Sequence, residues 1–206
     1  KLAIPRIDQH SSQTPVLRIQ ALDQLIDGEV LLKAECLQAT GSFKIRGALN
    51  AMSAITGQGD INTVVAFSSG NHGIGVAYAA RCLGTAATIV LPSDAPQTKI
   101  QQITSLGARI IYYDRQTEDR EQIANALLVD ASVALIKPYD DWHTIAGQGT
   151  CGAEIQTQIP GELDSVIVCA GGGGLAAGVG TYLRSHQPRL RIYTAEPEDW
   201  ADHQQS

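Results

Sequence analysis

The sequence has no run of lysine or arginine, no long apolar segment and no basic-then-apolar start. Its 15 basic residues are scattered and are outnumbered by 21 acidic ones, which gives a formal net charge of -6. Nucleic acids and anionic membranes bind clustered positive charge, and a membrane-spanning helix needs about 20 consecutive apolar residues. We therefore expect neither nucleic acid nor a membrane as a partner. The lack of a leader-like start favours a cytoplasmic location.

Patterns typical of metal or disulfide sites are also lacking. The five histidines form no H-E-x-x-H pair, which argues against a zinc hydrolase. No two of the four cysteines stand at C-x-x-C spacing, and three of them lie inside apolar strand or helix patterns. We expect buried, reduced thiols of a cytosolic protein. The four are Cys36, Cys82, Cys151 and Cys169.

What the sequence does contain is an alternation of short β-branched runs with longer amphipathic ones. The Val- and Ile-rich runs lack a clean two-residue alternation, which is typical of parallel strands buried on both faces. The expected strands span residues 30–36, 63–68, 86–92, 108–114, 133–139, 164–170 and 191–197. The expected helices lie near residues 42–55, 73–83, 97–106, 117–129, 145–158 and 175–186. Gly84 and Gly107 stand where two of these helices should end.

Repeated strand–helix–strand units predict an α/β fold with right-handed crossovers. We expect two open, twisted, mostly parallel sheets flanked by helices. Residues 63–140 would form a small α/β domain with its own sheet. Residues 1–62 and 141–206 would combine into a larger domain that contains the second sheet.

Four consecutive glycines, Gly171–Gly174, follow one expected strand and precede a helix. Such a turn allows close backbone approach and leaves N–H groups pointing outward at a helix N-terminus, which suits a phosphate. A plain flexible turn is the simpler interpretation. A dinucleotide site is the serious competitor, because Gly171-x-Gly173-x-x-Ala176 fits its fingerprint and Glu196 ends the next strand.

A second turn, "SSGNHG" at residues 68–73, also joins a strand to a helix. It gathers serine hydroxyls, an asparagine amide, a histidine and several backbone N–H groups at one helix N-terminus. This set of donors suits a carboxylate. An ordinary polar loop is the alternative.

A third turn contains a lysine where an apolar residue would be expected. In "TGSFKIRGA", Ser42 is a plausible helix N-cap, and Lys44 then falls in the first helical turn between Phe43 and Ile45. A helix N-terminus disfavours a cation, and burial does the same, so the pKa of Lys44 should lie below its usual value. Such an amine is nucleophilic near pH 7. A snorkelling surface lysine is the alternative.

Together the three turns favour a pyridoxal-phosphate (PLP) enzyme. A lysine can hold the cofactor's aldehyde, glycines its phosphate, and the second turn an amino-acid carboxylate. A nicotinamide (NAD) oxidoreductase explains only the glycine turn, and it stays as a more distant alternative. A third possibility is a non-catalytic amino-acid-binding fragment.

Four segments in order, "TGSFKIRGA", "SSGNHG", "AGQGT" and "GGGGL", resemble those of fold-type II (tryptophan synthase β-like) PLP enzymes. The chain is similar to the serine racemase and serine/threonine dehydratase branch over almost its whole length. Members of that branch are longer, so the resemblance implies a fragment that lacks the C-terminal part. It implies racemisation, β-elimination to a keto acid and ammonia, or both. Serine is the expected substrate, with threonine or 3-hydroxyaspartate as alternatives.

The resemblance also implies roles for individual residues. Lys44 would bond covalently to the cofactor, and Ser69 would act as the second base on the opposite face of the substrate. The implied cofactor-binding residues are Phe43, Lys44, Asn71, Gly171, Gly172, Gly173, Gly174 and Leu175. The implied substrate-binding residues are Ser68, Ser69, Asn71, His72 and Arg120.

A metal site is implied as well, formed by Glu196, the carbonyl of Trp200 and Asp202. Carboxylate and carbonyl oxygens suit Mg²⁺ or Ca²⁺, and solvated surface acids are the alternative. A nucleotide effector and a homodimer are further expectations from the same resemblance.

Overall fold

The computed structural model describes residues 2–57, 59–68 and 70–200. The strands are β1 (Val16–Arg18), β2 (Leu31–Lys33), β3 (Thr63–Phe67), β4 (Ala86–Pro92), β5 (Arg109–Tyr113), β6 (Val133–Leu135), β7 (Ser165–Cys169) and β8 (Arg191–Ala195). The α-helices are α1 (Ala3–Ile7), α2 (Gln20–Ile26), α3 (Lys44–Thr56), α4 (Asn71–Leu83), α5 (Gln97–Ser105), α6 (Arg120–Ala126), α7 (Trp142–Gln158) and α8 (Gly174–His186). Two short 3₁₀ helices are η1 (Glu35–Leu37) and η2 (Glu198–Trp200). Strands and helices alternate from β3 onward, so the predicted α/β class is confirmed.

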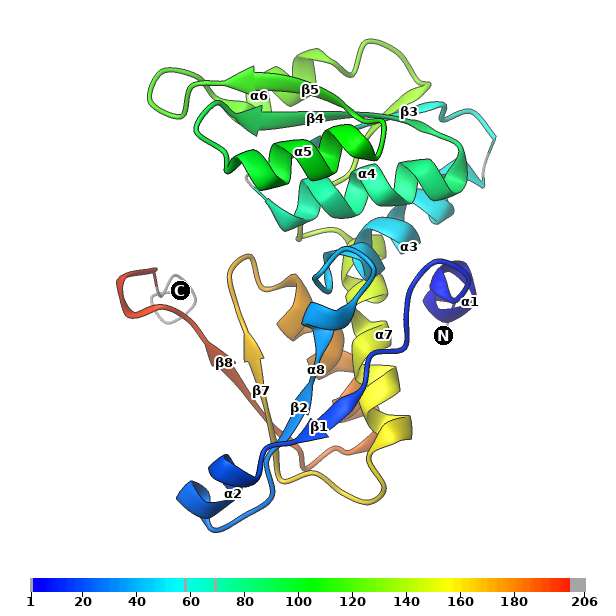
Figure 1. Cartoon of the computed structure of the whole chain (residues 1–206). Helices are drawn as coiled ribbons and strands as arrows, with labels where there is room; N and C mark the ends of the chain where they lie inside the picture. Colours follow the sequence, from blue (N-terminus) through cyan, green and yellow to red (C-terminus); the bar gives the residue numbers. More distant parts are fainter. Residues whose placement is uncertain (1, 58, 69, 201–206) are drawn as a thin grey trace.

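Four parallel strands in the order β5-β4-β3-β6 form the main sheet (Figure 1). Its inner strand β3 is buried on both faces, since its side chains point alternately to the two sides of the sheet and each side is covered by a core. Val64 and Ala66 enter the core shared with α3 and α4, whereas Val65 and Phe67 enter a second core under α6. This two-sided burial explains the unbroken apolar run of β3.

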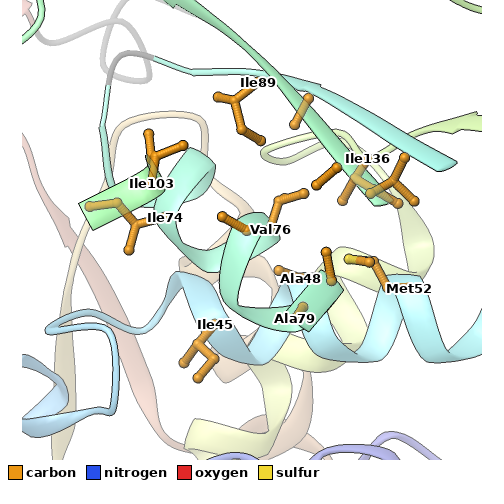
Figure 2. Packing of buried hydrophobic residues seen from close by; sticks show 14 of the residues in the cluster. Ile45, Ala48, Met52, Ile74, Val76, Ala79, Ile89, Ile103 and Ile136 are labelled. Carbon is orange, nitrogen blue, oxygen red and sulfur yellow. The ribbon is translucent and has the colours of Figure 1, made fainter. Parts of the chain in front are cut away.

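The larger core joins the sheet to α3 and α4. Figure 2 shows side chains of both helices meeting those of β4 and α5. The labelled members are Ile45, Ala48, Met52, Ile74, Val76, Ala79, Ile89, Ile103 and Ile136. The helices approach closely at Gly75, where an added Cβ would lie 3.2 Å from the carbonyl carbon of Lys44. The start of α3 is therefore held beside the second turn of α4.

Helices α7 and α8 lie in the other part of the molecule, next to the strand pair β7–β8 (Figure 1). Close packing of α7 on α3 requires Gly147, because an added Cβ there would overlap the carbonyl oxygen of Arg46. Helix α7 thus connects the start of α3 to α8 and to the glycine turn in front of it.

The strands outside the main sheet do not form the single buried second sheet that the sequence predicted. Among the described residues, β1–β2 is an antiparallel pair and β7–β8 a separate parallel pair. Ile167 and Tyr193, which face each other across β7–β8, are 71% and 49% exposed. Burial on both faces therefore holds for the middle of the main sheet and is wrong for β7 and β8. Cys36 and Cys169 are likewise exposed rather than buried, because they lie outside the cores.

Element boundaries follow local capping. Gly84, predicted as a helix stop, is the left-handed C-cap of α4 with a φ of 67°. Helix α7 begins at Trp142, three residues before its predicted start at 145, because the Asp141 carboxylate caps it by accepting the N–H of Thr144 at 2.8 Å. Segments α1, α2 and β1 were not predicted from the sequence.

All four strands of the main sheet fall inside the segment predicted as the small domain, residues 63–140. Helix α3 precedes that segment, yet its apolar face completes the same core. The division into domains stays a prediction. Among the described residues, no helix is long and apolar enough to cross a membrane.

Candidate active site

The carboxyl ends of all four strands in the main sheet supply residues to one cavity of about 280 Å³. Turn residues after β3, Lys99 after β4, Arg120 after β5 and Pro138 after β6 line it. Lys44 from the start of α3 and Gly172 from the glycine turn complete the lining. Ligands of open α/β sheets bind at this edge. The cavity therefore joins two of the predicted turns to the candidate lysine.

Lys44 is the first residue of α3, and its Nζ donates a hydrogen bond to the carbonyl oxygen of Pro138 at 2.8 Å. The same Nζ lies 5.4 Å from the ring centroid of Phe43. Burial lowers the pKa of Lys44 to about 8. The predicted direction of this shift is confirmed, and about a tenth of the amine is neutral at pH 7, far more than for an ordinary lysine.

The predicted N-cap at Ser42 is wrong. The helical backbone already includes Phe43, at φ -59° and ψ -18°, so Phe43 stands at the N-cap position of α3. A tight turn through Gly41, with φ 74°, precedes it. The buried Ser42 Oγ has no hydrogen-bond partner among the described residues. The Ser42 hydroxyl therefore does not cap the first N–H groups of α3.

The turn after β3 is organised by its own hydrogen bonds and by His72. The Gly70 N–H donates to Ser68 Oγ at 3.0 Å, and Asn71 then begins the 13-residue helix α4. Ser68, Asn71 and His72 all line the cavity. Ser69, the predicted second base, lies outside the described residues.

His72 is fixed as a neutral ring. Its Nε2 lies 2.9 Å from the carbonyl oxygen of Ile136 and must therefore donate to it. Burial lowers the pKa of His72 to about 4, so Nδ1 carries a lone pair at neutral pH and has no partner among the described residues. Towards a ligand, the Nδ1 atom of His72 can therefore only accept a hydrogen bond. A carboxylate at the turn would instead be held by the N–H groups of the first turn of α4.

Two cations lie at the side of the cavity formed by β4 and β5. Arg120 begins α6, and its guanidinium carbon stands 5.4 Å from the ring centroid of Phe67. Lys99, in α5, was not singled out from the sequence. Its Nζ lies so close to Gly70 that an added Cβ there would overlap it. Strand order could have identified Lys99. Because β4 lies next to β3 and runs parallel to it, a residue that follows β4 lies at the same edge of the sheet as the turn after β3.

The glycine turn connects β7 to α8, with Gly173 as a left-handed N-cap at φ 75°. An added Cβ at Gly172 would overlap the Tyr139 ring, so the turn needs glycine there. Gly172, Gly173 and Gly174 also line a neighbouring cavity of about 380 Å³, together with Thr194.

Gly171 and Leu175 were predicted to bind cofactor as well. Gly171 is exposed and does not line either cavity, and Leu175 packs against the core between α7 and α8. Gly172, Gly173 and Gly174 are thus the predicted cofactor-binding glycines that line a cavity, and the roles of Gly171 and Leu175 stay predictions.

These features fit PLP. The amine of Lys44 suits an aldehyde, and the exposed N–H groups of a glycine turn at the start of a 13-residue helix suit a phosphate. Both groups border a single cavity, because Gly172 lines it together with Lys44. A dinucleotide cofactor would leave the buried Lys44 amine without a role, because it forms no bond with an amine.

The predicted metal ligands are described only in part. Glu196 follows β8, Trp200 ends η2, and Asp202 lies outside the described residues. The metal site thus stays a prediction.

A buried ionic cluster lies behind Lys44 and was missed by the sequence analysis. Arg46 is fully buried and donates to Glu35 at 2.7 and 2.8 Å and to Glu154 at 2.6 and 2.8 Å. Lys33 also donates to Glu154, at 2.5 Å. Burial alone would raise the pKa of Glu154, but the hydrogen bonds from Arg46 and Lys33 hold it below its usual value. The cluster ties the first turn of α3 to α7 and η1.

Comparison with known proteins decides between the remaining interpretations. A family model described as "Pyridoxal-phosphate dependent enzyme" matches residues 7–206. The chain belongs to this pyridoxal-phosphate dependent enzyme family. This family excludes the NAD alternative. Together with the relatives described next, it confirms the resemblance to the serine racemase and dehydratase branch.

Two curated members of the family illustrate the similarity. The chain is 43% identical to L-threo-3-hydroxyaspartate ammonia-lyase of Saccharomyces cerevisiae, over 98% of the chain and 61% of that protein. It is 40% identical to serine racemase of Schizosaccharomyces pombe, over 99% of the chain and 63% of that protein. The chain thus spans about three-fifths of the length of these relatives.

Solved structures of the pyridoxal-phosphate dependent family have the same fold. The crystal structure of serine racemase from Dictyostelium discoideum matches with a TM-score of 0.92 at 36% identity, over 100% of this chain and 66% of that one. The processed form of threonine deaminase isoform 2 from Solanum lycopersicum matches with a TM-score of 0.87 at 33% identity, over 95% of this chain and 54% of that one. The fold-type II architecture predicted from the sequence is confirmed.

Proposed function

We propose that the whole protein is a PLP-dependent enzyme that racemises a small hydroxy amino acid, eliminates its β-hydroxyl to give a keto acid and ammonia, or does both. One observation carries the proposal: the amine of Lys44, with a pKa near 8, borders the same cavity as the turn at residues 68–73 and the glycine turn. Serine is the first candidate substrate, with threonine and 3-hydroxyaspartate as alternatives. The names of the two curated relatives, a serine racemase and a 3-hydroxyaspartate ammonia-lyase, support this substrate range.

Bound PLP would supply an electron sink that acidifies the α-proton of an amino acid. The residues of this chain would then position and move that proton. The Lys44 amine accepts it, and a pKa near 8 suits an amine that must gain and lose protons near neutral pH. The first turn of α4, helped by Asn71, holds the substrate carboxylate.

Two outcomes share this first proton transfer. Return of a proton to the opposite face, which we assign to Ser69 from the resemblance, inverts the amino acid. Departure of the β-hydroxyl instead leads to the keto acid and ammonia. Neutral His72 lines the cavity with an Nδ1 acceptor that has no partner among the described residues, and its ring adds no positive charge beside Lys44.

Three finer proposals accompany this function and rest on the family resemblance. Glu196, the Trp200 carbonyl and Asp202 would bind Mg²⁺ or Ca²⁺. The whole protein would form a homodimer and respond to a nucleotide effector. A cytoplasmic location agrees with the free state of all four cysteines.

Absorbance spectroscopy of the whole protein tests the function. We expect a visible band from lysine-bound cofactor that borohydride removes, with the reduced cofactor then found by mass spectrometry on the peptide that contains Lys44. Lys44→Ala should abolish the band and the turnover of L-serine. Lys137→Ala, which removes an exposed lysine outside the cavity, is the matched control and should keep both.

Three results would count against the proposal. Retained turnover in Lys44→Ala would refute the role of this lysine. A nicotinamide spectrum would restore the oxidoreductase alternative, and a protein without any chromophore after incubation with PLP would favour a non-catalytic binding role.

A further inference from the structure

The start of α3, which carries Lys44, is not fixed by a helix cap. Phe43 stands at the N-cap position and has no side-chain atom that can accept a hydrogen bond. The Ser42 hydroxyl has no hydrogen-bond partner among the described residues. Uncapped helix ends leave N–H groups unsatisfied and fray readily. Another contact must therefore hold the first turn of α3, and with it the Lys44 amine.

Arg46, in the same first turn, is held by every hydrogen-bond donor that it has. A guanidinium group carries five N–H donors. Nε and Nη2 donate to Glu35 at 2.7 and 2.8 Å, and Nη1 and Nη2 donate to Glu154 at 2.6 and 2.8 Å. The fifth bond runs from Nη1 to the Thr150 hydroxyl at 3.2 Å. Paired bonds to two carboxylates fix both the position and the orientation of the guanidinium plane.

Two of these partners, Thr150 and Glu154, lie on α7. The backbone of Arg46 also touches this helix, because a Cβ at Gly147 would overlap the Arg46 carbonyl oxygen. Helix α7 in turn packs directly on α8, since a Cβ at Gly178 would overlap backbone atoms of α7. The glycine turn stands immediately before α8. A continuous set of backbone contacts therefore runs from the start of α3, through α7, to the glycine turn.

The other carboxylate of the cluster, Glu35, lies in η1. It also accepts a hydrogen bond from the Thr14 hydroxyl at 2.5 Å. Lys33 pairs with Glu154 at 2.5 Å, so two cations and two carboxylates balance one another. Buried ion clusters of this kind are often no more stabilising than apolar side chains of similar volume. What this cluster provides beyond stability is a fixed geometry for the start of α3.

We propose that Arg46, clamped by Glu35 and Glu154, is a positioning residue that holds the Lys44 amine at the spacing from the glycine turn that one cofactor molecule requires. This inference rests on the proposed function and deepens it by naming what aligns the two binding points. PLP is a short, rigid molecule whose aldehyde and phosphate stand at a nearly constant separation. Binding at two points gains affinity only where both points fit the span of the ligand. The clamp therefore raises the affinity for the phosphorylated cofactor in particular.

The test compares PLP with deoxypyridoxal, which has the same aldehyde but a methyl group in place of the phosphate ester arm. Both are titrated into the cofactor-free whole protein, and the visible band reports the linkage to Lys44. The ratio of the two dissociation constants measures how much the phosphate contributes once the aldehyde is bound. In the unsubstituted protein, PLP should bind much more tightly than deoxypyridoxal.

Two variants remove the clamp in different ways. Arg46→Met combined with Glu35→Gln is charge-balanced, because it leaves Lys33 paired with Glu154. It should reduce the preference for PLP about tenfold or more, since a small misplacement of a binding group costs up to about a hundredfold. Arg46→Lys keeps the charge, but a single ammonium cannot form two bidentate pairs. It should reduce the preference as well, and it serves as the second variant if the first does not fold.

Met52→Ala is the matched control. Met52 lies about two turns further along α3 and is fully buried in the core shared with α4. Its truncation should lower stability in urea unfolding and leave the preference for PLP unchanged. A similar loss of preference in Met52→Ala would make the effect one of general stability and overturn the inference.

The remaining outcomes separate this inference from the proposed function. An unchanged preference for PLP in a folded Arg46 variant overturns the positioning role while the assignment of the enzyme stands. Full preference in Arg46→Lys would show that charge alone suffices and would overturn the role of the two bidentate pairs. An unsubstituted protein that forms no visible band with either aldehyde overturns the proposed function, and the positioning inference with it.

Discussion

Gly178, in the middle of α8, is expected to be far less tolerant of alanine than Gly180, two residues later in the same helix. A Cβ at Gly178 would overlap the carbonyl oxygen of Ile145 and lie 2.6 Å from the backbone nitrogen of Gly149. These are backbone atoms of α7, so they cannot rotate out of the way. A Cβ at Gly180 would meet only side-chain carbons of Ile192, at 3.7 and 3.8 Å, which is ordinary van der Waals contact.

The magnitude follows from two opposing effects on the free energy of unfolding. Replacing glycine with alanine inside a helix stabilises by about 1 kcal/mol at either position. At Gly178 an overpacking cost of about 1–3 kcal/mol opposes it, because α7 and α8 must separate. The helix-propensity gain cancels when the two variants are compared. Gly178→Ala should therefore be about 1–3 kcal/mol less stable than Gly180→Ala.

Urea unfolding of the two whole-protein variants measures this difference, provided that both give the same m-value. Because α8 begins at the glycine turn, Gly178→Ala should also weaken retention of PLP during dialysis, whereas Gly180→Ala should not. Equal stability of the two variants, or a more stable Gly178→Ala, would refute the close α7–α8 packing on which the position of the turn depends.

Two other predictions concern Lys44 and the cluster behind it. Acylation of the Lys44 amine in the cofactor-free protein, followed by mass spectrometry, should rise with pH around a midpoint near 8. In the unfolded chain the midpoint should lie near 10.5. The unfolded chain then binds more protons between these values, so the destabilising effect of burying Lys44 should decline as the pH rises from 8 to 10.5. Arg46→Met leaves Glu35 and Glu154 without their buried partner and should destabilise by about 3 kcal/mol or more in urea unfolding. Adding Glu35→Gln and Glu154→Gln should recover part of that loss, and no recovery would contradict the ionic explanation.

Local signals in the sequence accounted for most of the fold. Apolar β-branched runs marked β3 and β4, because a strand buried on both faces needs no polar alternation. Gly84 marked the end of α4, because only a residue that tolerates positive φ closes a helix in the left-handed conformation. Sequence-local reasoning failed at Ser42, where the adjacent Gly41 turn shifts the start of α3 by one residue.

The residues of the candidate site also fall into those that the sequence predicted and those that it did not. Lys44 and the two turns were recognisable because their chemistry is contained in short segments. Lys99, Tyr139 and Arg46 were not, because each acquires its role from residues far along the chain. Arg46 and Glu154, for example, are 108 positions apart. Nothing around "KIRGA" indicates that its arginine is buried between two carboxylates.

By itself, the sequence determined most of the strands and helices that follow α2, where glycine turns interrupt them, and that a lysine at a helix start would have a lowered pKa. The elements and turns follow from backbone sterics and side-chain periodicity. The lowered pKa was expected from the helix start and the apolar neighbours of Lys44, and burial is its cause in the structure. Only the tertiary structure decided which turns share a cavity, that His72 is a neutral acceptor and that Lys99 stands over Gly70 as an extra cation. Those outcomes depend on strand order and on packing between distant helices, which bring together groups that no short segment contains.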